Sequence, residues 1–387
     1  MDFDLPEEMK LFRATVRDWV EREAPKAWAR ELEAREADYP FELWEKMTRA
    51  GFHGLAVPEE YGGQGGDLLA QVELGRGLAR SLGGLTWVWA ITSFAGARAI
   101  TMMGREEQRE RFLPAIARGE LRFSIGFTEP GGGTDVLGAL RTSARRVDGG
   151  WVLSGNKTWC SSAHVADYVL LLARTTHGEA KAHRGLSLFL LPTAAQGVSI
   201  HPLAKLGMRA IGASDVGLDD VFVEDALLLG AADEAWYALL PTLNTERTLV
   251  ASFCLGILDG VLEDALAYVR DRQAFGRAIG EFQILQHYIA DIAMQRAQVE
   301  LMVYHAAWLQ SLDRPAHLET TMTKVVASEA AVSAADRGIQ ILGGMGYSAE
   351  TDMQRYWRDA RLWPIGPITN EMARNVIAEQ LGLPRSF

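Results

Sequence analysis

Apolar residues recur at helical spacing in the first and last thirds of the chain. In the first third, the pattern predicts helices at Glu7–Glu23, Phe41–Ala50, Leu68–Ser81 and Gln108–Ala117. In the last third, it predicts three long helices and a shorter one, at Ala235–Arg272, Glu281–Leu312, Thr320–Leu342 and Thr369–Leu381. Long helices with short connections are typical of a helical bundle.

The middle of the chain has a different pattern. Short apolar runs alternate with Gly, Asp and Pro, which predicts strands at Phe123–Phe127, Trp151–Leu153, Tyr168–Ala173 and Leu186–Leu191. Asp148-Gly149-Gly150 predicts a hairpin turn. Strands grouped between two helical regions indicate a separate β domain. We therefore expect an α+β chain with three domains: helical at 1–121, β at 122–229, and a helical bundle at 230–387.

Composition narrows the functional classes. The chain of 387 residues has 39 Lys and Arg against 50 Asp and Glu, which gives a net charge of −11. This charge repels phosphates, so we expect neither a nucleic acid nor a membrane as a partner. Two distant cysteines, Cys160 and Cys254, cannot form a disulfide framework or a CxxC metal site. The first residues lack the basic stretch of a signal peptide, and we expect a cytoplasmic protein without a bound metal.

Two segments of the β region carry candidate chemistry. Thr128–Asp135 (TEPGGGTD) follows a predicted strand; its three glycines allow a planar ligand to approach the backbone and its threonines supply hydroxyls. A tight turn would use the same residues. Gly155–Ser162 (GNKTWCSS) places Trp159 beside hydroxyl groups, although a tryptophan is by default part of a core.

Two further segments lie in the helical last third. Arg272–Gln283 (RQAFGRAIGEFQ) is predicted to be a helix–turn–helix whose arginines either bind phosphates or form an exposed charged turn. Gln340–Tyr347 (QILGGMGY) is followed by Arg358–Arg361 (RDAR), and its glycines either end a helix or allow close approach to a ligand. Each segment alone is weak evidence for a site.

Together, and in this order, the four segments closely resemble those of the acyl-CoA dehydrogenase family. The resemblance extends from about Asp4 to the C-terminus. It implies that family's fold, with an N-terminal helical domain, a central β-barrel-like domain and a C-terminal four-helix bundle. It also implies FAD as the cofactor and a homotetramer in which a neighbouring subunit supplies part of each FAD site.

The resemblance assigns ligand contacts residue by residue. Residues of the β domain would line the flavin, namely Ile125, Phe127, Thr128, Gly133, Thr134, Trp159 and Ser161. Residues of the bundle would hold the rest of FAD, namely Arg272, Phe275, Gln283, Gln340, Gly344 and Thr369. Three residues would contact the acyl-CoA, namely Thr134, Asn244 and Arg247.

The best-known catalytic base of the family is missing. Relatives have a glutamate shortly after RDAR, in a Tyr-Glu-Gly-Thr run, whereas Pro367 occupies that position here. In a subset that resembles the isovaleryl-CoA and long-chain enzymes, the base lies instead on the first long helix of the bundle, in a Glu-Arg pair. Glu246-Arg247 matches that pattern. The resemblance therefore implies Glu246 as the base.

The residues around Glu246 support the same assignment independently. Glu246 shares one stripe of the predicted helix with Leu243, Val250, Ile257 and Val261. A carboxylate on an apolar face is costly unless it has a function, and its pKa tends to rise. The alternative is a structural carboxylate that is paired with Arg247 or with a neighbouring helix.

The implied reaction is α,β-dehydrogenation of an acyl-CoA to the trans-2-enoyl-CoA. Glu246 would take the α-proton, flavin N5 the β-hydride, and an electron-transferring flavoprotein the electrons. Pro367 has no N–H, so Gly366 or Ile368 would donate the hydrogen bond that polarises the thioester carbonyl. Two alternatives stay open. One is an oxidase, monooxygenase or enoyl-CoA reductase on the same fold, and the other is a non-catalytic CoA-binding subunit of a hetero-oligomer.

The acyl group is the least determined part of this prediction. Trp87 and Trp89 lie on the helix that forms the floor of the acyl pocket in relatives, and Gly366 stands where relatives have tyrosine. Two large rings, together with open space near the α-carbon of the substrate, favour a shallow acyl pocket. We therefore expect a short or branched acyl group.

Overall fold

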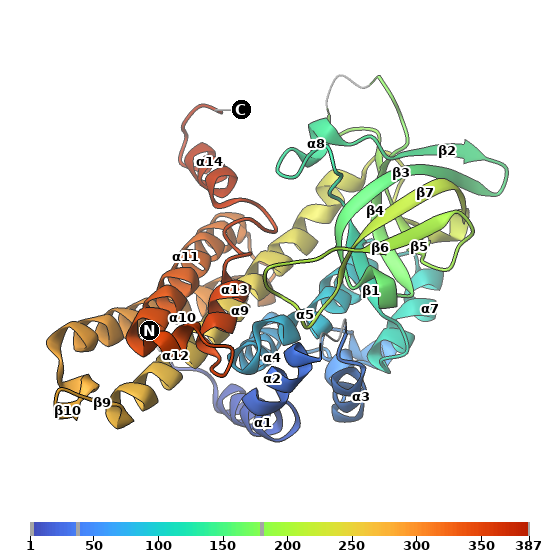
Figure 1. The fold of residues 1–387 in the computed structure, drawn as a ribbon. Helices are drawn as coiled ribbons and strands as arrows, with labels where there is room; N and C mark the ends of the chain where they lie inside the picture. The colour runs from blue at the N-terminus through green and yellow to red at the C-terminus, as the bar shows by residue number, and fades with distance from the viewer. Residues whose placement is uncertain (1–3, 36–38, 179–181, 386–387) are drawn as a thin grey trace.

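The computed structural model of the chain describes residues 4–35, 39–178 and 182–385. A sheet domain lies at one end and long helices extend from it toward the other, with the N-terminal helices packed along one side (Figure 1). This arrangement of a sheet domain between helical domains confirms the predicted α+β class. Within the described ranges, no helix is long and apolar enough to cross a membrane.

The N-terminal domain is helical throughout. Its helices are α1 (Glu7–Glu23), α2 (Lys26–Ala34), α3 (Phe41–Ala50), α4 (Leu68–Ser81), α5 (Gly83–Ile91), a π-helical segment (Thr92–Arg98), α6 (Ala99–Met103) and α7 (Glu106–Ala117). The bounds of α1, α3 and α4 are those that the hydrophobic pattern predicts, because each helix has one apolar and one polar face. The pattern does not predict α5, since all nine of its residues are buried and no polar face marks its period.

One eight-stranded sheet forms the central domain. Its strands are β1 (Phe123–Gly126), β2 (Ser143–Val147), β3 (Gly150–Ser161), β4 (Tyr168–Arg174), β5 (Leu186–Pro192), β6 (Val198–Pro202), β7 (Ala213–Glu224) and β8 (Leu228–Leu229), with the short helix α8 (Val136–Ala139) after β1. The strand order is β6-β7-β3-β2-β4-β5-β8, and β1 pairs with β4 in parallel. The predicted hairpin joins β2 to β3, with Val147 opposite Gly150.

Long helices form the C-terminal domain. They are α9 (Ala235–Asp271), α10 (Gln283–Ser311) and α11 (His317–Leu342), followed by α12 (Gly344–Tyr347), α13 (Met353–Ala360) and α14 (Asn370–Gln380). Helix α9 packs against α4, α10 and α11, and so joins the two helical domains. The predicted helix–turn–helix at Arg272 needs one correction. The turn contains a two-stranded ladder, β9 (Gln273–Ala274) with β10 (Arg277–Ala278).

The RDAR segment joins all three domains. Asp359 is fully buried, and its carboxylate accepts hydrogen bonds from the N–H of Met208 (2.5 Å) and of Gly84 (3.2 Å). Burial raises the pKa of Asp359 to about 6. Arg358 donates to Glu33 at 2.6 Å. The segment therefore fixes the loop before β7 and the start of α5 against the bundle.

Candidate active site

Glu246 lies inside the bundle, on α9. Its side chain is buried, and burial raises the pKa of the carboxyl group to about 7, although the charges of Arg247 and Lys324 oppose this shift. Among the residues that the structure describes, none forms a hydrogen bond or an ion pair with the Glu246 carboxylate. A carboxylate with this pKa can accept a proton near neutral pH.

Arg247 is directed to other partners. Its Nη1 lies 3.1 Å from Asn244 Oδ1, 3.2 Å from His317 Nδ1 and 3.5 Å from Thr321 Oγ1. All three partners are neutral acceptors on α9 or α11. The reading of Glu246 as the structural partner of Arg247 is therefore not supported. Asn244 and Arg247, which the resemblance assigns to substrate contact, lie together beside Glu246.

Lys324 is a buried cation that the sequence reasoning missed. Its Nζ, on α11, donates to the carbonyl of Ile368 (2.5 Å) and to Asn370 Oδ1 (2.8 Å). Burial lowers the pKa of Lys324 to about 8. A single lysine within the run of small and apolar residues Thr320–Ser328 is the signal that could have revealed it. Lys324 connects the surroundings of Glu246 to the loop that precedes α14.

That loop, residues 361–369, carries an aromatic cluster. Trp363 is buried, with its ring centroid 4.9 Å from that of Trp87 and 4.8 Å from that of Phe253. Phe253 lies seven residues after Glu246 on α9, about 10 Å along the helix and on the same face. The rings of Trp87, Phe253 and Trp363 therefore form an aromatic wall about two helical turns from Glu246. A Cβ added to Gly366 would meet nothing within 4 Å, so the space beside it is open.

A buried ion pair holds the TEPGGGTD loop to β3. Lys157 is fully buried and its Nζ lies 2.8 Å from Glu129 Oε1. The Glu129 carboxylate also accepts from the N–H of Arg141 (2.7 Å) and of Thr142 (2.9 Å), and the N–H of Thr158 donates to the Thr128 carbonyl at 2.9 Å. Both residues lie in segments that the sequence marks as candidate sites, but the sequence alone does not predict that they pair. The ion pair and these hydrogen bonds bring the two predicted flavin segments side by side.

The predicted flavin contacts of the β domain lie at its surface. Trp159 is 58% exposed and has φ of +60°, a left-handed conformation that is strained for a tryptophan and falls at an irregularity in the β3–β7 pairing. Thr134 and Gly133 are exposed, and a Cβ on Gly133 would meet nothing within 4 Å. The remaining four, Ile125, Phe127, Thr128 and Ser161, are half-buried around them.

The other predicted FAD contacts lie at the end of the molecule opposite the sheet domain (Figure 1). Phe275, in the β9–β10 turn, is 95% exposed and also left-handed, with φ of +51°. Arg272, Gln283, Gln340 and Gly344 are exposed too. Figure 1 places β9 and β10 far from the sheet domain, because α9, with 37 residues, extends about 55 Å between them. One chain therefore does not bring the two groups of residues together.

Thr369 lies apart from both groups. Its hydroxyl oxygen accepts from the N–H of Met372 at 3.2 Å and so caps α14. A local structural role is therefore visible for this residue, whereas its predicted contact with FAD stays a prediction.

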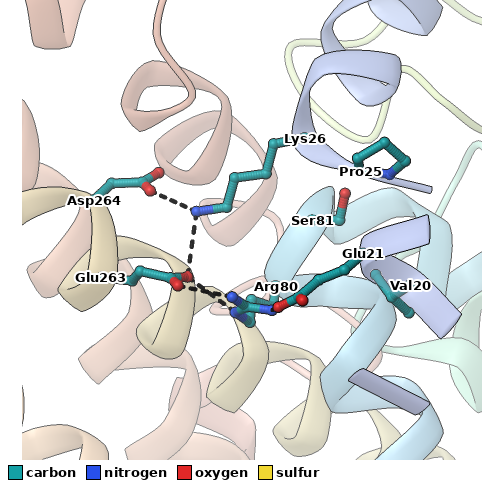
Figure 2. A pocket seen from close by; sticks show the side chains of 8 residues that line it. All are labelled: Val20, Glu21, Pro25, Lys26, Arg80, Ser81, Glu263 and Asp264. Carbon is teal, nitrogen blue, oxygen red and sulfur yellow. Dashed lines mark hydrogen bonds and ion pairs between the residues drawn. The ribbon is translucent and has the colours of Figure 1, made fainter. Parts of the chain in front are cut away.

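A charged cavity lies between the N-terminal helices and α9 (Figure 2). Lys26 pairs with Asp264 (2.5 Å) and with Glu263 (3.5 Å), and Arg80 pairs with Glu263 (2.7 Å). Glu263 follows Glu246 by 17 residues, so this cavity is about 25 Å along α9 from the candidate base. Its ion pairs fasten α2 and α4 to α9, and it is not part of the candidate active site.

A sheet domain between two helical domains, with exposed aromatic segments and a buried carboxylate, agrees with the architecture that the sequence resemblance implies. Residues 6–120, 124–221 and 234–382 match the N-terminal, middle and C-terminal domain models of acyl-CoA dehydrogenases. The chain belongs to the acyl-CoA dehydrogenase family, whose enzymes act on CH–CH groups.

Known proteins are similar over nearly the whole chain. A probable acyl-CoA dehydrogenase of Bacillus subtilis is 35% identical over 98% of this chain and 100% of its own length. A caffeyl-CoA reductase-Etf complex subunit of Acetobacterium woodii is 32% identical over 97% and 98%. The structure of butyryl-CoA dehydrogenase from Megasphaera elsdenii superposes with a TM-score of 0.93, at 29% identity, over 98% of this chain and 100% of that one.

The cofactor of this family is FAD. A further solved structure with this fold, an FAD complex of PigA, has a TM-score of 0.92 and 25% identity over 99% of this chain and 100% of that one. The residues present here fit the group: two exposed aromatic rings, open glycines and surface hydroxyls are suited to a flat ligand with a long polar tail. This agreement supports the sequence-based expectation of a flavoprotein.

Proposed function

We propose that this protein catalyses the α,β-dehydrogenation of an acyl-CoA thioester, with Glu246 as the catalytic base. The observation that carries the proposal is the Glu246 carboxyl group, which is buried, unpaired among the described residues and shifted to a pKa of about 7. The alternative position cannot serve, because Pro367 has no acidic side chain. Glu246 is therefore the candidate for removing the α-proton.

Removal of an α-proton requires a polarised thioester carbonyl. Of the two N–H groups that could donate to its oxygen, that of Gly366 already donates to the Leu362 carbonyl at 3.0 Å. The N–H of Ile368 has no acceptor within the described part of the chain. We therefore assign the backbone donor to Ile368, and place Asn244 and Arg247 along the acyl-CoA beside Glu246.

FAD, when bound, would accept the hydride that leaves the β-carbon. The chain would hold it with Trp159, Ser161 and the TEPGGGTD loop on one side. Arg272, Phe275, Gln283, Gln340 and Gly344 would come from a second copy. An electron-transferring flavoprotein is the proposed acceptor, and the Etf-complex relative supports this choice.

The reverse reaction, reduction of an enoyl-CoA, is the second candidate. It is favoured by one observation, the caffeyl-CoA reductase-Etf complex subunit among the relatives. The same groups would act in reverse, with Glu246 as the proton donor. Reduced protein that is reoxidised rapidly by an enoyl-CoA, but whose oxidised form is not bleached by any acyl-CoA, would favour the reductase.

The pH dependence of flavin reduction should follow Glu246. The base acts as the carboxylate, so with a pKa of about 7 the rate should rise about tenfold per unit below pH 7 and level off above it. Stopped-flow bleaching of the flavin, measured from about pH 5.5 to 9 at low substrate concentration, gives the profile. A rate that is constant between pH 5.5 and 8 would contradict this prediction.

We propose a homotetramer, because one chain separates the two halves of the FAD site. Exposed apolar side chains on α10 offer a surface for association, namely Met294, Leu301 and Trp308, which lie seven residues apart on one face. Trp159→Ala and Arg272→Ala should each lose FAD when produced alone. Co-production should restore about one quarter of the sites, because random assembly then unites an intact sheet side with an intact turn.

Two results would contradict this proposal of shared sites. One is a flavin-loaded monomer, detected by light scattering at the working concentration. The other is co-production that restores no FAD beyond the content of either variant alone, measured by absorbance after heat release.

The aromatic wall should limit acyl length. We expect short or branched acyl-CoAs to bleach the flavin fastest in an anaerobic panel. Trp87→Leu should shift the preference to longer chains, by about fourfold in kcat/KM for each methylene newly buried. Trp89→Leu is the matched control on the same helix, because Trp89 Nε1 instead bonds the Phe52 carbonyl at 2.9 Å. An equal shift of acyl-chain preference in both variants, or no shift in either, would contradict the prediction that the aromatic wall limits acyl length.

A further inference from the structure

A buried ammonium group lies on α11, the helix that packs against the α9 helix of the candidate base. Lys324 is fully buried, and its Nζ bonds only neutral oxygens, the Ile368 carbonyl and Asn370 Oδ1. In the described part of the chain, no carboxylate lies within 4.0 Å of this Nζ. Burying a cation without a paired anion costs free energy, so packing alone does not account for a lysine at this position.

Lys324 holds the loop before α14 through its hydrogen bond to the Ile368 carbonyl. A network of further hydrogen bonds stabilises this contact. Asn370 Nδ2 donates to Ser328 Oγ (3.1 Å) and to Glu329 Oε1 (3.2 Å), while Arg374 pairs with Glu329 at 2.7 Å. The network joins α11 to Ile368, the residue whose N–H we assign to the substrate carbonyl, and to the start of α14.

The charge of Lys324 also favours the ionised form of the Glu246 carboxyl group. The two groups interact through the low-dielectric interior of the bundle, where electrostatic interactions extend over longer distances than in water. The other charged or titratable groups around the two are Arg247 and Cys254 on α9, Glu329 on α11 and Glu371 on α14. Burial keeps the Cys254 thiol neutral by raising its pKa, and Arg247 is bound to Asn244 and His317. Arg247 favours the ionised form of Glu246 from the same helix, and Lys324 adds a second, smaller effect in the same direction from the facing helix.

We infer that Lys324 is a positioning residue of the proposed dehydrogenase, holding the substrate-carbonyl loop at Ile368 and adding to Arg247 a second positive charge that favours the ionised form of Glu246. The inference rests on the proposed function. It assigns two tasks to one side chain, and these tasks can be separated experimentally, because Asn370→Ala loosens the loop but leaves the ammonium group in place.

The first test is a pH profile of flavin bleaching by a saturating acyl-CoA. Lys324→Met should move the midpoint upward by about one pH unit, since an opposite charge is removed. Asn370→Ala should keep the parent's midpoint and lower only the limiting rate. A folded, flavin-loaded Lys324→Met protein with the parent's midpoint would overturn the charge assignment.

The second test measures binding and needs no turnover. The probes are acetoacetyl-CoA, which binds as an enolate, and butyl-CoA thioether, which lacks the carbonyl. Loss of a well-placed hydrogen bond to an anionic oxygen should make the probe ratio, the dissociation constant of the thioether divided by that of acetoacetyl-CoA, fall about tenfold or more in Lys324→Met and in Asn370→Ala. An unchanged ratio in both variants would overturn the loop assignment.

If Lys324→Met does not fold, Lys324→Arg carries the test. It retains the charge but not the geometry of the two bonds, so the inference predicts the parent's pH midpoint with a lower limiting rate and a reduced probe ratio. A shifted midpoint would overturn it. Failure of the proposed function is distinguishable, because the parent protein itself would then not be bleached by any acyl-CoA.

Discussion

Lys157→Met should destabilise the protein and release its FAD. The substitution leaves the Glu129 carboxylate buried without its cation, and removing one partner of a buried ion pair typically costs about 3–5 kcal/mol. The TEPGGGTD loop depends on the same carboxylate, which accepts the N–H groups of Arg141 and Thr142. Urea denaturation followed by circular dichroism, together with FAD content, measures both effects.

Two controls make this result specific to the buried pair. Lys10→Met removes a lysine whose ion pair with Glu7 is exposed to solvent, and should leave the urea midpoint close to that of the parent. Lys157→Met combined with Glu129→Gln should recover part of the loss, because the second change removes the uncompensated charge. A Lys157→Met protein with the parent's urea midpoint and full FAD content would contradict the structural role of the pair.

The sequence predicts those elements whose own residues determine them. Helices α1, α3 and α4 have one apolar and one polar face, so their bounds follow from the pattern alone. Helix α5 is buried on every side, Gly and Asp interrupt the apolar positions of β7, and β8 has only two residues, so the pattern predicts none of the three. In these places the neighbouring elements determine the structure, and periodicity carries no signal.

The same distinction holds for the candidate site. Glu246 can be predicted because its neighbours at helical spacing are apolar. An apolar environment is unfavourable for a carboxylate, and such a position indicates a functional group. The Glu129–Lys157 pair and the Lys324–Ile368 bond join residues 28 and 44 positions apart, so they follow only from the fold. The separation of Trp159 from Phe275 likewise depends on the length and direction of α9.

Glu246→Gln should abolish most of the activity while leaving the protein intact. Glutamine keeps the size of the side chain but cannot accept the proton, and loss of a positioned base typically costs ~10²–10⁴-fold in rate. The substitution also removes a buried ionisable group, so stability and FAD content should stay close to those of the parent. Adding Pro367→Glu to this variant asks whether the position used by other relatives can still serve, and partial rescue is the expected outcome.

We propose that Glu246 is the only catalytic base, and this assignment can be tested by experiment. It is tested most directly by anaerobic stopped-flow bleaching of the flavin with saturating acyl-CoA, comparing the parent with Glu246→Gln at the same FAD loading. We expect the variant to bind substrate analogues normally and to bleach at least a hundredfold more slowly, a loss at the lower end of the ~10²–10⁴-fold range for a missing base. Bleaching of Glu246→Gln at the rate of the parent would contradict it and place the base elsewhere.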